Sequence, residues 1–234
     1  MTEAGETVLA EASEIEESIL ELEVKLMSKD QRLKGTIRLT APEGITNYLL
    51  MPHLVEFRHL HPDIEIELIV SSQDLQLMQH EADIAIRMTT KPPPTSIGKK
   101  ICDYKIGIYV AENYLEQVKD LEYQKYDYVL FDFGFNFFMQ PYFSPDAQPK
   151  VVFKSASIQA VTNAVKEGMG AAILPCLIGE KEPKLKRVLS PFEQTTELWL
   201  LTHADLRQTA RVKVLMNHLY ESLREERVFI EASV

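Results

Sequence analysis

Hydroxyl-bearing side chains gather where predicted strands end and predicted helices begin. A hydroxyl donates or accepts a hydrogen bond without carrying charge, so it suits a small polar metabolite. The free N–H groups and positive dipole at a helix N-terminus favour a carboxylate on that metabolite. For any single Ser or Thr, capping a helix or forming a turn is the commoner role. The hydroxyl candidates for ligand binding are Thr40, Ser71, Ser72, Thr89, Ser155 and Ser157.

Two charged residues and one aromatic residue extend this candidate set. Glu43 would oppose an anion if it pointed inward, and the alternatives are that it faces solvent or selects an amine-bearing ligand. Arg87 is suited to a bidentate grip on a carboxylate, or equally to pairing with an acidic neighbour. Phe131 opens a Phe-rich run to Phe138 that could line a binding cleft, although most of that run is more typical of a core. The predicted contacts also include Ala41, Pro42 and Met88.

No arrangement typical of catalysis stands out. A nucleophile with its base, a carboxylate pair and a phosphate-binding loop are all missing from the pattern. Cys176 follows Pro175 at a predicted strand end without a recognisable His partner, so we interpret it as a buried structural thiol. His59 and His61 do not make a metal site by themselves. We therefore expect a binding module with no catalytic residues, no metal and no other cofactor.

The first half of the chain predicts strands that alternate with helices. Strands are expected at Thr36–Thr40, Ile64–Val70 and Asp83–Arg87, where β-formers recur. Helices are expected from the turn at residues 41–44 to about Leu60, and over Asp74–Glu81. Pro52 should sit early in the first of these helices or kink it. This β-α-β-α-β order favours parallel strands with right-handed crossovers.

A stiff break at Lys91–Thr95 precedes a second α/β pattern. We expect a helix from about Ser155 to Lys166, and a final helix from about Asp205 to Arg227 that packs on the first unit. Strands are predicted at Lys105–Val110, Tyr128–Phe131, Lys150–Phe153, Ala171–Leu174 and Glu197–Thr202, the last of which closes the second unit. The predicted fold is thus α/β, with two Rossmann-like subdomains over 35–104 plus 205–234 and over 105–204. Small ligands bind between such units, at strand C-termini and helix N-termini.

An N-terminal segment over 1–34 has a heptad pattern. Its apolar residues follow one another at spacings of 4, 3, 4, 3 and 4, the narrow two-in-seven stripe of a coiled coil. The alternative is an ordinary amphipathic helix that packs on its own domain. We expect a long linker helix that dimerises through Val8, Ala12, Ile15, Ile19, Leu22 and Leu26.

Composition and charge limit the classes of function that this chain could have. The 234 residues are 45% hydrophobic and carry a net charge of −10, so most of the surface would repel nucleic acid. No apolar run approaches the roughly 18 residues of a membrane span, and the acidic N-terminus is unlike a signal peptide. With only two cysteines in the chain, a reduced compartment fits best. We expect a cytoplasmic protein.

Six short motifs, in order, resemble the LysR-type transcriptional regulators. Each motif is weak alone, and the order makes the resemblance specific. The motifs are the Thr2–Gly5 entry before the heptad helix, Gly35–Pro42, Pro52 with Phe57, His61-Pro62 before the alternating strand, Ala82–Arg87, and Glu167–Pro175.

The resemblance implies a linker helix followed by an effector-binding domain with the type 2 periplasmic-binding-protein fold. The family's winged helix-turn-helix is not matched by this sequence, so the chain is expected to correspond to the part that follows it. The family further implies a small-molecule effector that alters the angle between subdomains, a homodimer or homotetramer, and DNA contact only through that domain. A solute-binding protein shares this bilobal fold, but it would require a signal peptide and has no use for a coiled-coil arm.

Overall fold

The computed structural model describes residues 2, 8, 11, 12, 15, 18, 19, 32–71, 82–131, 143, 149–189 and 196–232. The chain separates into two units, each described by itself below. Unit 1 comprises Met1–Pro42, Pro52–Lys100 and Trp199–Glu221. Unit 2 comprises Glu43–Met51, Ile101–Leu198 and Ser222–Val234. None of the helices in the described ranges is both long enough and apolar enough to cross a membrane.

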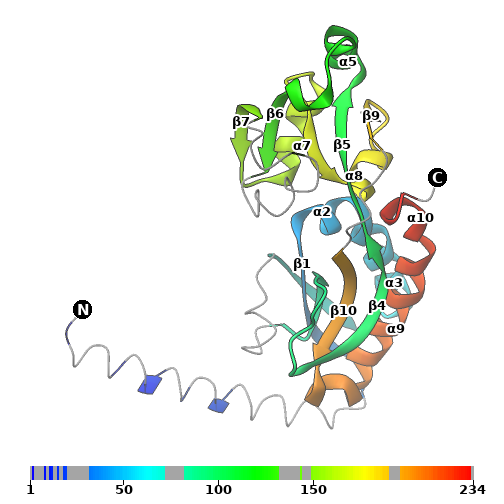
Figure 1. Cartoon of the computed structure of the whole chain (residues 1–234). Helices are drawn as coiled ribbons and strands as arrows, with labels where there is room; N and C mark the ends of the chain where they lie inside the picture. The colour runs from blue at the N-terminus through cyan, green and yellow to red at the C-terminus, as the bar shows by residue number, and fades with distance from the viewer. Residues whose placement is uncertain are drawn as a thin grey trace. The chain divides into compact units, whose positions relative to one another are not determined.

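Unit 1 is built on a five-stranded sheet with the order β2-β1-β3-β10-β4. Figure 1 labels β1, β4 and β10 of this sheet. The predicted parallel pairing is confirmed, because β1 runs parallel to both β2 and β3. Alternate β1 residues Ile37 and Leu39 are fully buried, as expected for a strand whose side chains alternate between faces. The strands are β1 (Gly35–Ala41), β2 (Ile64–Val70), β3 (Ile84–Met88), β4 (Ser96–Tyr104) and β10 (Thr196–His203).

Two helices of unit 1, α3 (Met51–Leu60) and α9 (Ala210–Glu225), pack together through aromatic rings. The buried Phe57 ring lies 4.7 Å from the His61 ring and 5.4 Å from the His218 ring, measured between centroids. His218 Nε2 donates to the His53 carbonyl oxygen at 2.9 Å. The short η3 (Ala204–Gln208) leads into α9, whose fully buried stripe is Val212, Leu215, Leu219 and Leu223.

The helical segment before β2 changes its winding twice, the second time just before Pro52. It begins as α2 (Glu43–Ile45), widens into a π-helix η1 (Thr46–Leu50) and continues as α3, in which Pro52 is the second residue. Proline has no N–H, so it cannot donate to the carbonyl four residues earlier, that of Tyr48. Lys181 Nζ donates to that Tyr48 oxygen at 3.1 Å. Pro52 is early in α3 but is the tenth residue of the continuous helical segment that begins at Glu43, and a side chain from elsewhere satisfies the affected carbonyl.

Unit 2 contains two small sheets joined by an isolated parallel bridge between Tyr128 and Ala171. In one sheet β5 (Ile106–Ala111) lies between β8 (Ala172–Pro175) and β9 (Leu185–Arg187), antiparallel to both. In the other, β6 (Asp127–Phe131) pairs in parallel with β7 (Lys150–Ser155). Besides α2 and η1, its helices are α5 (Glu112–Val118), η2 (Tyr123–Lys125), α7 (Ile158–Lys166), α8 (Cys176–Lys181) and α10 (Arg227–Ile230).

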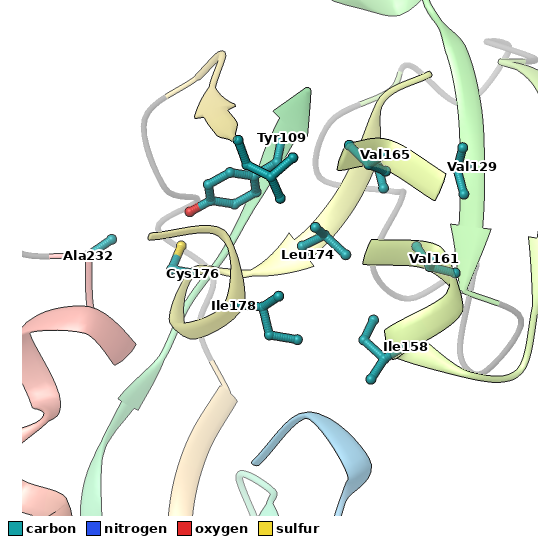
Figure 2. Packing of buried hydrophobic residues seen from close by; sticks show 11 residues of the cluster. Tyr109, Val129, Ile158, Val161, Val165, Leu174, Cys176, Ile178 and Ala232 are labelled. Carbon is teal, nitrogen blue, oxygen red and sulfur yellow. The ribbon is translucent and has the colours of Figure 1, made fainter. Parts of the chain in front are cut away.

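The core beside α7 and α8 is shown in Figure 2. Val161 and Val165 of α7 project into this core with Leu174 of β8. The Tyr109 ring lies against α8, where a β-carbon on Gly179 would overlap its Cε1 and Cζ atoms. The absence of a side chain on Gly179 therefore leaves the space that the Tyr109 ring occupies in the core.

Several expected boundaries differ from the structure. The strand predicted at Glu197–Thr202 does not close the second unit, because β10 lies between β3 and β4 in the sheet of unit 1. Glu43–Met51 and the end of the chain from Ser222 cluster with unit 2, whereas 35–104 and 205–234 were expected in the first subdomain. The helix predicted at Asp74–Glu81 lies outside the described residues. The elements that were not predicted include β4, α5, η2, α8, β9 and α10.

The N-terminal segment is helical at the heptad positions that the structure describes. Val8, Ile15 and Ile19 are 68%, 62% and 53% exposed, and Ala12 is exposed as well. Leu22 and Leu26 lie outside the described residues. In this chain the described part of the seam faces solvent, so dimerisation through it stays a prediction.

Candidate functional site

In unit 1, the sheet brings Thr40 and Arg87 together. The parallel register sets Thr40 of β1 opposite Ala85 of β3, two residues before Arg87. Arg87 Nη2 donates to Thr40 Oγ1 at 3.0 Å, and its Nη1 donates to the Ile86 carbonyl oxygen at 2.9 Å. Both side chains are buried. The buried guanidinium thus holds a hydroxyl and a carbonyl in place at the carboxyl end of the sheet.

The other predicted residues of unit 1 lie near the same strand ends. Ser71 follows β2, and its N–H donates to the Ala41 carbonyl oxygen at 3.0 Å. Thr89 follows β3, and its Oγ1 accepts from the Lys91 N–H at 3.0 Å, which is a turn contact. Pro42 is buried, Met88 is partly buried, and Ser72 lies outside the described residues.

In unit 2, Ser155 and Ser157 organise the start of α7. Ser157 is the N-cap residue, and its Oγ accepts from the Ala160 N–H at 3.2 Å. Ser155 Oγ accepts from the Ser157 N–H at 3.1 Å. The two hydroxyls therefore satisfy backbone donors at this helix end, the structural role that is commonest for such residues.

Glu43 binds the same helix end. Its Oε1 accepts from Ser157 Oγ at 3.0 Å, and its Oε2 accepts from the Ile158 N–H at 3.0 Å. A carboxylate here gains two hydrogen bonds and the positive end of the helix dipole. Neither expected alternative, solvent exposure or the selection of an amine, describes this contact. The sequence-based expectation was that the N–H groups at this helix end would be free for a carboxylate ligand. In the structure, the Glu43 carboxylate binds one of them, the Ile158 N–H.

Four residues near this contact were not predicted: Thr46, Tyr48, Gln159 and Glu182. Tyr48 OH donates to Glu182 Oε1 at 3.0 Å and accepts from Gln159 Nε2 at 3.3 Å. Burial, ahead of the nearby Glu182 carboxylate, raises the pKa of Tyr48. Thr46 Oγ1 is buried and has no hydrogen-bond partner within the described part of the chain. Position along the sequence could have pointed to two of these residues. Thr46 is three residues after Glu43, and Gln159 is in the first turn of α7.

Phe131, predicted to line a cleft, ends β6 and packs against the core that contains Val129 and Val161. It is partly buried, which fits a packing role at least as well as ligand contact. The remaining predicted run, 132–138, lies outside the described residues.

A separate polar cluster lies around Cys176, which is fully buried. The Tyr109 hydroxyl lies beside this thiol in Figure 2 and donates to Glu180 Oε1 at 2.8 Å. Glu180 in turn pairs with Arg187 Nη1 at 2.8 Å. Burial raises the pKa of Cys176, which disfavours the reactive thiolate. The geometry is that of a structural thiol, as predicted.

The chemistry available at these places is noncovalent recognition through hydroxyls, backbone N–H groups and one guanidinium. Among the described residues, His, Cys, Asp and Glu side chains do not gather in threes that could hold a metal ion. Each unit supplies its own part of the predicted set: Thr40, Ser71 and Arg87 lie in unit 1, and Glu43, Phe131, Ser155 and Ser157 in unit 2. Shared contact with one ligand stays a prediction.

Comparison with known proteins finds relatives that are described as transcriptional regulators. A probable HTH-type transcriptional regulator, LtrA from Klebsiella pneumoniae, is 25% identical over 117 residues, which cover 50% of this chain and 38% of that protein. The Mau operon transcriptional activator of Paracoccus denitrificans is 22% identical over 82% of this chain and 66% of its own length. The matched regions thus span only part of each of these relatives.

Solved structures show the same fold. The regulatory domain of CrgA, a LysR-type regulator from Neisseria meningitidis, matches with a TM-score of 0.70 at 17% identity, over 81% of this chain and 99% of that one. Full-length AphB from Vibrio cholerae matches with a TM-score of 0.69 at 21% identity, over 94% and 80%. The family model described as the LysR substrate binding domain matches residues 30–224. The chain therefore belongs to the LysR substrate-binding domain family.

Proposed function

We propose that this chain is the effector-sensing part of a LysR-type DNA-binding transcriptional regulator of the cytoplasm. The family match over residues 30–224 supports a regulatory role. The effector is a small polar metabolite, and a carboxylate or an amino acid suits the hydroxyls and the guanidinium at the predicted site. In the longer protein, DNA is contacted through a winged helix-turn-helix domain, and the acidic effector-sensing part does not bind it.

The observation that carries the binding part of the proposal is the shared edge of β1, β2 and β3. These parallel strands end at Ala41, Val70 and Met88, so their carboxyl ends meet at one edge of the sheet. Ligands of open α/β sheets bind outside such carboxyl ends. Thr40 and Arg87 are already joined at this edge by a hydrogen bond, which fixes the geometry that a ligand would meet.

Signal transmission requires two states with different effector affinity. We propose that the effector favours one relative angle of the two units. We also propose that paired linker helices pass the change to the DNA-binding domains of a dimer or tetramer. The exposed Val8, Ile15 and Ile19 side chains support pairing, because burying them would remove apolar surface from water.

A thermal-shift screen against small carboxylates, amino acids and aromatic acids tests the proposal. A true effector raises the melting temperature of the wild type, because it binds only the folded state. It should lose this effect on a double variant, Thr40→Val with Ser155→Ala. The matched control is Thr36→Val, at the opposite end of the same strand β1, where the side chain is partly exposed. A ligand that stabilises all three proteins equally would place its site elsewhere, and a screen without any stabilising compound would count against an effector of these classes.

A further inference from the structure

Lys181, the last residue of α8, joins two segments of unit 2 that lie far apart along the chain. Its Nζ donates to the Tyr48 carbonyl oxygen of η1 at 3.1 Å, and it pairs with Glu226 Oε2 at 2.7 Å. The same ammonium group lies over the Phe229 ring, 5.2 Å from its centroid. An ammonium group has three N–H donors, so one lysine serves both segments at once. The Lys181 and Glu226 side chains are only 25% and 28% exposed, so water screens this pair less than a surface pair.

The acidic and aromatic contacts of Lys181 belong to a strap, defined as Glu226–Ala232, which follows α9 and contains α10. Ile230 is fully buried and Ala232 is buried as well, so the strap is anchored by apolar contacts. Its backbone contact is long, because the Lys105 N–H donates to the Ile230 carbonyl oxygen at 3.3 Å. The ion pair with Lys181 is shorter, and charge-assisted hydrogen bonds are the stronger kind. The lysine is therefore a major polar anchor of the strap.

The winding of η1 depends on contacts from outside its own backbone. It is a π-helix over Thr46–Leu50, a wide winding that is rare and occurs mostly as a single turn. Pro52 has no N–H to offer the Tyr48 carbonyl oxygen, and Lys181 donates to that oxygen instead. The Thr46 hydroxyl is buried and has no hydrogen-bond partner among the described residues, which costs this segment further stability.

Both segments that Lys181 contacts adjoin places where the chain passes between the units. Residues up to Met51 cluster with unit 2 and those from Pro52 with unit 1, so the chain passes between units directly after η1. It passes again within α9, between Glu221 and Ser222, shortly before the strap. A change in the winding of η1 or in the attachment of the strap therefore acts on a connection between the units.

We propose that the strap controls the winding of η1 through Lys181. While Glu226 holds the ammonium group in place, Lys181 supplies the donor that the Tyr48 carbonyl oxygen does not receive from Pro52. When the strap detaches, the lysine loses its charged partner, its donor leaves that oxygen and η1 unwinds. Any event that displaces the strap is thereby conveyed to the connection between the units. This conformational device goes beyond the effector site and does not depend on it.

Native-state amide hydrogen exchange of the whole chain, read by mass spectrometry, tests this coupling. Lys181→Met removes the ammonium group and keeps a long, unbranched side chain. Amides of both η1 and α10 should then exchange at least about tenfold faster than in the wild type, because a hydrogen bond from a charged group is lost on each side. Glu226→Gln keeps the shape of its side chain and removes the charge. It should speed exchange in α10 and, through Lys181, in η1 as well.

A double variant and a matched control show whether Lys181 carries the effect. Once Lys181→Met is present, adding Glu226→Gln should not speed exchange in η1 any further, because the two residues act through one contact. The control is Glu167→Gln, which removes an exposed pair with Lys184, at 3.7 Å, in the same unit. It should leave η1 unchanged. Amides of β5, in the core of unit 2, give the reference for a general loss of stability.

Three outcomes would overturn the proposal. In the first, Glu226→Gln leaves exchange in η1 unchanged or slows it. In the second, the effects of Glu226→Gln and Lys181→Met on η1 are fully additive. In the third, exchange in η1 rises only as much as in β5. If Lys181→Met folds poorly, the comparison of Glu226→Gln with Glu167→Gln still decides, because both change one carboxylate to an amide.

Discussion

Replacing Gly179 by alanine should destabilise unit 2, although the same change usually stabilises a helix. Gly179 is inside α8, where alanine is favoured over glycine by about 1 kcal/mol. The new methyl group would overlap the Tyr109 ring, however, and overpacking of a core costs about 1–3 kcal/mol. If the ring moved away, its hydrogen bond to Glu180 would be lost, at a cost of about 1–3 kcal/mol. Together these two costs outweigh the helix propensity, and we expect a net loss of roughly 1–5 kcal/mol.

Urea unfolding followed by circular dichroism measures this loss. The fluorescence of Trp199, the single tryptophan of the chain, reports on unit 1 in the same samples. Gly44→Ala is the matched control, because its β-carbon would lie 3.1 Å from the flexible end of Ile178, and its cost should be under about 1 kcal/mol. In a Tyr109→Leu background, Gly179→Ala should no longer destabilise. A stabilising effect of Gly179→Ala in the wild type would refute the packing argument.

The remaining predictions concern Asp83 and the linker seam. Burial, only partly opposed by the hydrogen bond from the Arg38 N–H, raises the folded-state pKa of Asp83. Stability from this group is therefore fully present below the unfolded value of about 4, and it declines as pH rises through the raised folded value. In Asp83→Asn this decline should disappear. The melting temperature of the variant should therefore rise relative to that of the wild type as the pH increases from about 4 through the raised folded pKa. Parallel curves of melting temperature against pH would contradict the assignment. Replacing both Ile15 and Ile19 by Asp should abolish helix pairing in light scattering, while Ser13→Asp, off the predicted seam, should leave assembly intact; unchanged assembly of the first variant would exclude the heptad seam as the interface.

The elements with strong local patterns could be predicted from the sequence, and those that depend on distant partners could not. Alternation predicted Ile64–Val70 as a strand, and its parallel partner β1 was expected as well. The strand β4 was missed, because Gly98 and the pair Lys99-Lys100 interrupt its pattern. Gly98 makes sense only beside β10, where a β-carbon would overlap the Leu200 carbonyl oxygen.

The candidate site shows the same division. A capping role for Ser157 follows from a Ser in front of an apolar helical pattern, so local sequence was enough to weigh it. The partner of Ser157 could not be predicted, because Glu43 is 114 residues away along the chain. Arg87 was assigned either a ligand or an acidic neighbour, and its hydrogen bond to Thr40 depends on the register between β1 and β3.

The place of β10 in the sheet affects how the protein is made on the ribosome. β10 begins at Thr196, more than a hundred residues after β3 ends at Met88, yet the two strands are neighbours in the sheet. At a translation rate of about 5–20 residues per second, roughly 5–20 s pass between the synthesis of the two strands. Throughout this interval the edge of β3 that later meets β10 lacks its partner, and Ile84 and Ile86 lack their final cover. The nascent chain therefore passes through a period in which pairing with a neighbouring chain competes with completion of its own sheet.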